Sequence, residues 1–355
     1  MTTLTERSGV RFHAPDEATA AAPPEVRGGS REDVRLLVAR PEGLQHRRFS
    51  DLPEQLAPGD LVVVNNSATV NGEIDAIRNG ADRGGRPIVL HAATRLDAVT
   101  WVVELRTAPD ASAPVLDAAA GETIGVGEMC VTLLDPYPHE GSSPTGSGNR
   151  LWRAHAEGDL RTLLNRHGRP IAYGYLDRRY PLAAYQSVFS TVPGSAEMAS
   201  AGRPFTDELI TRLVARGVAV APITLHTGVS SQEVDEGPQS EWYDVPPATA
   251  RLVELTRENG GRVVATGTTV TRALESAVRD GFVRPSSGWT DRVITPEHPA
   301  VVVNGLITGW HDPLASHLLL VEAIAGTDLV QRAYDAAVAG GYHWHEFGDS
   351  ALFLP

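Results

Sequence analysis

The 355-residue sequence predicts an α/β protein: a mixed or parallel sheet with flanking helices, plus an inserted all-β, barrel-like domain. After residue 158, helical patterns alternate with apolar strands, which is typical of a sheet covered on both faces. Residues 67–155 instead contain short apolar runs separated by Gly, Pro and Asp, with almost no helical periodicity. Strand-like segments also precede the insertion. We therefore expect an α/β domain of residues 1–66 and 156–355 and a β-barrel domain of residues 67–155.

Composition limits the classes of partner and compartment. The net charge of −13 argues against broad affinity for nucleic acid, although residues 160–170 and 176–181 are candidate basic patches. Cys130 is the only cysteine, so an intramolecular disulfide is impossible. We find no pattern of a signal peptide and no apolar run of membrane-spanning length. These features predict a cytoplasmic protein.

The first half of the chain is expected to be rich in strands. Residues 1–30 are polar and rich in Ala and Pro, and are expected to be partly extended. Three strand-like segments follow before residue 66: "DVRLLVAR", "HRRFSDL" and "GDLVVVNNS". The inserted domain contributes "RPIVLHAA", "TWVVELRT", "ETIGVGEMCVTLL" and "LWRAHAE", and residues 136–149 are expected to form a hairpin loop.

The second half alternates between helices and strands. "DLRTLLNRHG" is expected to be a helix that ends at Gly168, and the next helix should begin after Thr206 as N-cap and stop at Gly217. Residues 218–225 form a nearly unbroken apolar strand. The remaining expected elements are helix "ATARLVELTRENGG", strand "RVVATG", helix "VTRALESAVRDG", strand "AVVVNGLIT", and the helices "PLASHLLLVEAIAG" and "LVQRAYDAAVAGG".

Polar residues follow several of the predicted strands. Because open α/β sheets bind ligands beyond the carboxyl ends of their strands, we expect these residues to meet at one site. They are His226 after the first strand, Gly267, Thr268 and Thr269 after the second, Trp310 and His311 after the third, and Asp349 near the chain's end.

The turn at Gly267 resembles a phosphate cradle without its lysine. Thr268 or Thr269 could cap the following helix. Arg272 is unusual there, because a cation in the first turn opposes the helix dipole. One interpretation is an ion pair with Glu275, one turn later. The other is that Arg272 and the free N–H groups of the helix face a ligand that carries a carboxylate or a polarised ring.

The histidines suggest proton transfer rather than metal binding. His226 and His311 follow predicted strands, and histidine exchanges protons near neutral pH. His343 and His345 are expected on one face of a strand with Glu346 opposite, which is too few ligands for zinc. No metal is predicted. The sequence also lacks the GxSxG, Walker and GxGxxG motifs.

Taken together, the motifs resemble the S-adenosylmethionine:tRNA ribosyltransferase-isomerases of queuosine biosynthesis. The resemblance extends in order over nearly the whole chain. The matching stretches are "RLLVAR", "FSDLPEQLAPGDLVVVNNS", "LLNRHGRP", "AYQSVFS", "SAGRPFTDELI", "VAVAPITLHTGV", "SEWY", "GGRVVATGTTVTRALES", "GWTD", "LITGWHDPLAS" and "FGDSAL".

The resemblance implies that S-adenosylmethionine is a co-substrate, whose ribosyl unit is transferred to a 7-aminomethyl-7-deazaguanine base in tRNA and isomerised, releasing adenine and methionine. It implies catalytic roles for His226 and His311 as base or acid, with Glu241 and Asp349 as further candidates. The residues implied in binding S-adenosylmethionine are Gly267, Thr268, Thr269, Arg272, Glu275 and Trp310, of which Arg272 would clamp the methionine carboxylate.

The chain differs from the family pattern on the expected acceptor side. Asn65-Asn66-Ser67-Ala68 replaces Asn-Asp-Thr-Arg, and Arg203-Pro204 replaces a Leu-His pair. Two alternatives therefore stand beside tRNA modification. One is a relative that uses S-adenosylmethionine with a small-molecule acceptor, and the other is a non-catalytic protein that binds a nucleotide or RNA.

Overall fold

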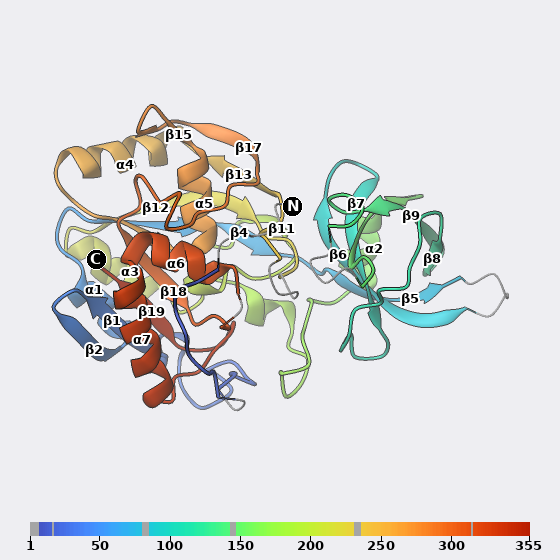
Figure 1. Cartoon of the computed structure of the whole chain (residues 1–355), viewed down its shortest axis with the longest axis horizontal. Coiled ribbons are helices and arrows are strands. Elements are labelled where there is room, and N and C mark those ends of the chain that lie inside the picture. Colours follow the sequence, from blue (N-terminus) through green and yellow to red (C-terminus); the bar gives the residue numbers. More distant parts are fainter. Residues whose placement is uncertain (1–6, 16–17, 80–84, 143–146, 231–235, 314) are drawn as a thin grey trace.

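The computed structural model describes residues 7–15, 18–79, 85–142, 147–230, 236–313 and 315–355. Residues 143–146 of the expected hairpin loop and 1–6 and 16–17 of the N-terminal stretch lie outside these ranges. The described chain forms a nine-stranded mixed sheet with helices and, beside it in Figure 1, a closed barrel of six strands. The predicted fold class is confirmed.

The large sheet has the strand order β17-β13-β12-β3-β14-β18-β19-β1-β2. Its central strands β12, β3, β14 and β18 run parallel, whereas β19 runs antiparallel to β18 and therefore begins where β18 ends. The strands are β1 (Arg35–Arg40), β2 (Gly43–Arg48), β3 (Leu61–Asn65), β12 (Ala219–His226), β13 (Glu241–Val245), β14 (Val263–Thr266), β17 (Ser286–Thr290), β18 (Gly305–Gly309) and β19 (Ser350–Phe353).

Helices cover both faces of this sheet. They are α1 (Leu52–Gln55), α3 (Asp207–Ala215), α4 (Pro247–Glu258), α5 (Thr268–Ser276), α6 (His317–Ala325) and α7 (Thr327–Ala339). Helix α2 (Leu160–His167) lies at the barrel instead, and short 3-10 helices occur at Arg31–Asp33, Phe49–Asp51, Leu182–Tyr185 and Ser200–Gly202. Successive residues of β3 point to opposite faces, so Leu61 and Val63 join the core with α4 to α7, and Val62 and Val64 join the core with α1 and α3. The expected N-cap is confirmed, because the Thr206 hydroxyl accepts from the N–H of Leu209 at 3.1 Å.

The barrel has the strand order β10-β7-β6-β5-β8-β9. It is closed because β9, at one end of this order, pairs with β10 at the other end. Its strands are β5 (Glu73–Arg78), β6 (Arg86–Arg95), β7 (Thr100–Thr107), β8 (Thr123–Val126), β9 (Met129–Pro136) and β10 (Leu151–Ala156). Alternate residues such as Leu90, Val103 and Trp152 fill the interior. Helix α2 packs Leu160 and Leu164 against this core.

Several expected elements differ in the structure. The expected strand over 300–308 is only β18, because residues 301–303 are held by a buried carboxylate instead of a neighbouring strand. Residues 343–346 form a turn with an isolated bridge at Trp344 and not a strand. Beyond residue 66, β4 (Ser67–Thr69) pairs with β11 (Val192–Ser195) and not with the barrel. A further small hairpin pairs β15 (Val278–Arg279) with β16 (Phe282–Val283).

Candidate active site

A cavity of about 960 Å³ lies at the carboxyl edge of the parallel strands. The turns after β12, β14 and β18 all reach it, because parallel strands bring their carboxyl ends to one edge of the sheet. The segment before β19 arrives at the same edge because β19 runs the other way. Residues from these segments in the cavity wall are Thr227, Gly228, Gly267, Thr268, Thr269, Gly309, Trp310, His311, Asp312, His345 and Glu346.

The turn between β14 and α5 places the start of a helix at the cavity. Gly267 is the N-cap residue, with a φ of +93° that favours glycine, and an added Cβ would lie 3.2 Å from the Cβ of Ala201. Thr268 and Thr269 occupy the first turn of α5, so neither is the N-cap that the sequence suggested. The first backbone N–H groups of α5 have no partner within the helix, and the residues that carry them line the cavity.

Arg272 is already neutralised by the protein. Its guanidinium forms an ion pair with Glu241 of β13 and donates to the carbonyl oxygens of Gln239, Thr290 and Arg292. Burial raises the pKa of Glu241, while Arg272 acts to lower it. Both residues line the cavity. The N–H donors of Arg272, which were expected to bind a ligand carboxylate, are therefore directed at oxygen atoms of the protein. The ion pair of Arg272 is with Glu241, so the expectation that it pairs with Glu275 is wrong.

Glu275 and Asp349 have structural roles. The fully buried carboxylate of Glu275 accepts from three consecutive N–H groups, those of residues 301–303. Asp349 pairs with Arg35 and accepts from the N–H groups of Arg35 and His343. Neither residue lines the large cavity. The family resemblance implied ligand or catalytic roles for both, but their oxygen atoms accept hydrogen bonds that hold loops.

His311 lies in the cavity wall beside a second histidine. Its Nε2 is 3.0 Å from the hydroxyl oxygen of Thr308, and its ring stacks on that of His317 at 4.8 Å with an interplanar angle of 6°. Burial lowers the pKa of His311 well below its ordinary value, and His317 lowers it further. Burial also lowers the pKa of His317 to about 4. Both imidazoles are therefore neutral near pH 7, which suits proton acceptors.

His226 lies outside the cavity lining. It is the last residue of β12, and its Nδ1 is 2.8 Å from the hydroxyl oxygen of Ser67. Its ring stacks on Trp242 at 5.4 Å, and Gly194 packs so closely that a Cβ there would lie 2.4 Å from the imidazole. The next residue, Thr227, reaches the cavity instead. The sequence located the end of β12 correctly. Successive side chains of a strand point to opposite faces, however, and that of His226 points to Ser67 and Trp242 and not into the cavity.

Trp310 joins an aromatic cluster at the cavity wall. Its ring packs edge-on against Tyr334 at 4.9 Å and against Tyr342 and Trp344 at 5.6 Å each. The indole Nε1 is buried and has no hydrogen-bond partner among the described residues. The Oε1 atom of Gln239, also in the wall, is likewise buried and unpartnered.

Sequence reasoning missed part of the wall. Tyr173, Tyr175 and Glu197 line the cavity but come from segments outside the strand ends that were considered. Tyr175 donates to Glu346 at 2.6 Å, and Tyr173 donates to Glu197. Burial raises the pKa of Glu346 to about 7. In the sequence, these tyrosines stand out only as the pair in "AYGY". That segment has neither helical nor strand periodicity, so its position relative to the sheet could not be predicted.

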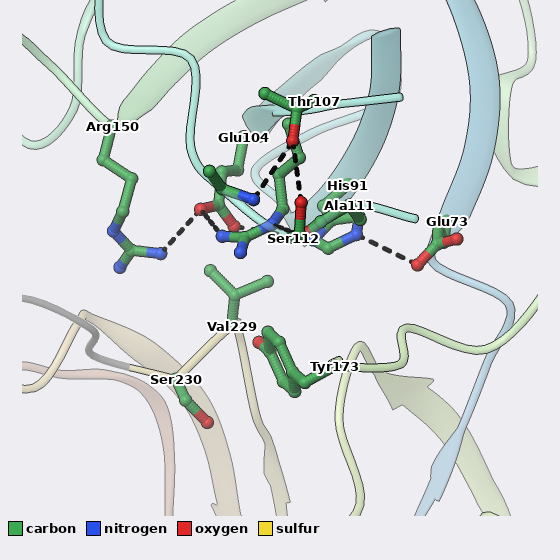
Figure 2. A network of polar contacts seen from close by, with 12 residues as sticks. Glu73, His91, Glu104, Thr107, Ala111, Ser112, Arg150, Tyr173, Val229 and Ser230 are labelled. Carbon is green, nitrogen blue, oxygen red and sulfur yellow. Dashed lines mark hydrogen bonds and ion pairs between the residues drawn. The ribbon is translucent and has the colours of Figure 1, made fainter. Parts of the chain in front are cut away.

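The barrel supports this part of the cavity through a buried polar network (Figure 2). His91 lies 3.1 Å from Glu73 and 3.5 Å from Glu104, and Glu104 pairs with Arg106 and Arg150. Burial alone would lower the pKa of His91, but the two carboxylates raise it. Arg106 and Ser112 continue from the network into the cavity wall. The barrel therefore contributes directly to the site.

In the ranges that the structure covers, no three His, Cys, Asp or Glu side chains are grouped to hold a metal ion. Across the same ranges, no helix has the length and apolar character required to cross a membrane.

The chain matches known proteins over almost its full length. The family model described as "Queuosine biosynthesis protein" matches residues 7–353. The S-adenosylmethionine:tRNA ribosyltransferase-isomerase of Symbiobacterium thermophilum is 38% identical over 355 residues, covering 97% of this chain and 98% of the relative. That of Moorella thermoacetica is 35% identical with the same coverage of both chains. The crystal structure of S-adenosylmethionine tRNA ribosyltransferase from Thermotoga maritima is 28% identical, with a TM-score of 0.51, covering 96% of this chain and 98% of that one. The chain therefore belongs to the queuosine biosynthesis protein family, as its motifs indicated.

Proposed function

We propose that the protein is an S-adenosylmethionine:tRNA ribosyltransferase-isomerase. It transfers the ribosyl unit of S-adenosylmethionine to a 7-aminomethyl-7-deazaguanine base in tRNA and isomerises it, releasing adenine and methionine. The observation that carries this proposal is the end-to-end match to enzymes of that name at up to 38% identity. The cavity supports it, since about 960 Å³ is large enough for a nucleoside with its amino-acid arm.

The turn after β14 is proposed to hold the methionine carboxylate. The residues that begin α5, Thr268 and Thr269, line the cavity, and the N–H groups of a helix start favour an anion. Gly267 permits the backbone conformation that starts the helix there. Arg272 contributes less directly, because its charge is balanced by Glu241. Trp310 offers an indole N–H to the same ligand.

His311 is proposed as the base that removes a proton from the carbon beside the sulfonium. It lines the cavity, and its lowered pKa keeps the imidazole neutral, so that a ring nitrogen has a lone pair for a proton although the ring is a weaker base than an exposed histidine. His317 stacks on it and lies in the wall as well.

The acceptor of the ribosyl unit is either tRNA or a small molecule, and an experiment distinguishes the two. Ser67 and Ala68 stand where the family has Thr and Arg, and they form β4 beside β11 rather than the cavity wall. The proposed acceptor is tRNA, because the full-length relatives are named as tRNA ribosyltransferase-isomerases. A cytoplasmic location is proposed with it, on the basis of the lone free thiol of Cys130.

The test is to incubate the protein with S-adenosylmethionine and measure free adenine and methionine. One reaction contains tRNA that carries 7-aminomethyl-7-deazaguanine, a second contains the same tRNA with guanine, and a third contains no RNA. Release with the modified tRNA alone is the expected result. Release with another acceptor supports the small-molecule alternative, and binding without any release supports a non-catalytic protein.

A further inference from the structure

One part of the cavity wall has no role in holding S-adenosylmethionine as proposed above. It consists of Tyr173, Tyr175, Glu197, His345 and Glu346, all of which line the cavity, and we name it the aromatic–acidic wall. Its residues come from three segments far apart in the sequence: the stretch after α2, the stretch after β11 and the turn before β19. Its chemistry differs from that of the turns after β12, β14 and β18.

The rings of this wall form a continuous stack. The ring centroids of Tyr173 and Tyr175 are 6.1 Å apart at an angle of 27°, and those of Tyr175 and His345 are 4.9 Å apart at 17°. Figure 2 shows Tyr173 beside the barrel network, where the Cζ atom of Arg106 lies 5.8 Å from its ring centroid. Tyr175 lies between the other two rings, so a flat heterocycle would stack at an end of this series or pack against the ring edges.

Among the described residues, the carboxylates of the wall accept only from uncharged donors. Glu346 accepts from the Tyr175 hydroxyl, and Glu197 accepts from the Tyr173 hydroxyl and from the backbone N–H and hydroxyl of Ser230. Within the described ranges, neither carboxylate forms an ion pair with an arginine or histidine, in contrast to Glu241 with Arg272. A half-buried carboxylate without a cation is costly, and burial raises the pKa of Glu346 to about 7 for this reason. A cationic ligand would favour the ionised form of Glu346 and complete the site.

We propose that the aromatic–acidic wall binds the acceptor base, with the heterocycle stacked on the rings and its primary ammonium group paired with Glu346 and Glu197. This inference rests on the proposed function, which supplies an aminomethyl-substituted deazaguanine as acceptor. That base carries a flat ring system, N–H donors and an ammonium group, and it has no anionic group. S-adenosylmethionine also has a flat ring and cationic groups, but its carboxylate is already assigned to the turn after β14, which is a different part of the cavity wall.

The experiment measures discrimination between two RNAs. An anticodon stem-loop with 7-aminomethyl-7-deazaguanine and the same stem-loop with guanine are titrated by fluorescence anisotropy against wild-type protein and Glu346→Gln. The substitution keeps the size of the side chain and removes its charge. Wild-type protein should prefer the modified RNA, and Glu346→Gln should lose about tenfold of that preference. Its affinity for the unmodified RNA and for S-adenosylmethionine should be unchanged.

Two further variants separate a direct contact from a general effect. Tyr175→Phe keeps the ring of the stack and removes the hydroxyl that orients Glu346, so it should reduce the preference by less than Glu346→Gln does. Glu258→Gln is the matched control, because Glu258 is an exposed acid at the end of α4 outside the cavity. An unchanged preference in Glu346→Gln, or a loss of S-adenosylmethionine affinity with the preference intact, would overturn the inference.

Failure of the proposed function is recognised separately. If wild-type protein releases no adenine with the modified RNA, the proposed function is wrong, whatever the variants do. If wild-type protein releases adenine and Glu346→Gln still discriminates between the two RNAs as wild type does, the function stands and only the assignment of the wall is lost.

Discussion

Arg272 of α5 and Glu241 of β13 form a largely buried ion pair in the cavity wall, although 31 positions separate them in the sequence. The pair joins helix α5, which follows β14, to an antiparallel strand near the sheet's edge. Three backbone carbonyl groups complete the coordination of the guanidinium. Arg272 therefore has a structural role in the site, and its replacement would disturb the packing of the cavity wall.

Replacement of Arg272 should destabilise the fold. Arg272→Ala leaves Glu241 buried without its cation, and breaking such a pair costs about 3–5 kcal/mol. Glu241→Gln should cost less, because the guanidinium keeps its three carbonyl partners. Urea unfolding of both variants provides the measurement. If Arg272→Ala unfolds like wild type and only loses affinity for S-adenosylmethionine, the residue is a ligand clamp after all.

Glu275 should matter for stability and not for binding. Glu275→Gln replaces a carboxylate that accepts three N–H groups with an amide that brings its own N–H groups into the same pocket. We expect the free energy of unfolding to decrease by about 1–3 kcal/mol. Calorimetry should give an S-adenosylmethionine Kd equal to that of wild type and of the exposed control Glu258→Gln. A weakened Kd in folded protein would place Glu275 in the site.

The two candidate histidines should separate in a kinetic experiment. His311→Ala is expected to reduce adenine release by about 10²–10⁴-fold, the usual contribution of a general base, while S-adenosylmethionine still binds. His226→Ala should retain most of the rate, since His226 bonds Ser67 outside the cavity lining. Single-turnover adenine release compares them directly. The opposite order of effects would return the catalytic role to His226.

The buried histidines predict a pH dependence of stability. Burial, with Arg272 nearby, lowers the pKa of His317 from 6.5 to about 4 in the folded protein. Between these two pH values the unfolded chain binds more protons than the folded protein, so the free energy of unfolding decreases as pH falls through this window. His317→Asn removes this titration. Urea unfolding at pH 7 and at pH 5 should therefore show a smaller loss for the variant than for wild type. An equal loss would show that His317 is already protonated in the fold.

Local sequence predicted where the site lies. Alternating apolar strands and amphipathic helices indicated the sheet, and the residues after β12, β14 and β18 converge because parallel strands end at one edge. The same reasoning found His311 and the turn at Gly267, both in the cavity wall. These features depend on neighbours within a few positions, which a sequence pattern records.

The partners of charged groups were decided by tertiary structure alone. A sequence pattern offered Arg272 only the acid one turn later, whereas the fold brings it Glu241 and gives Glu275 three amide groups near residue 302. The tyrosines of the aromatic–acidic wall are likewise brought to the cavity from outside the strand ends. Desolvation in a packed interior requires each buried charge to find the nearest complementary group, and that proximity exists only after the chain has folded.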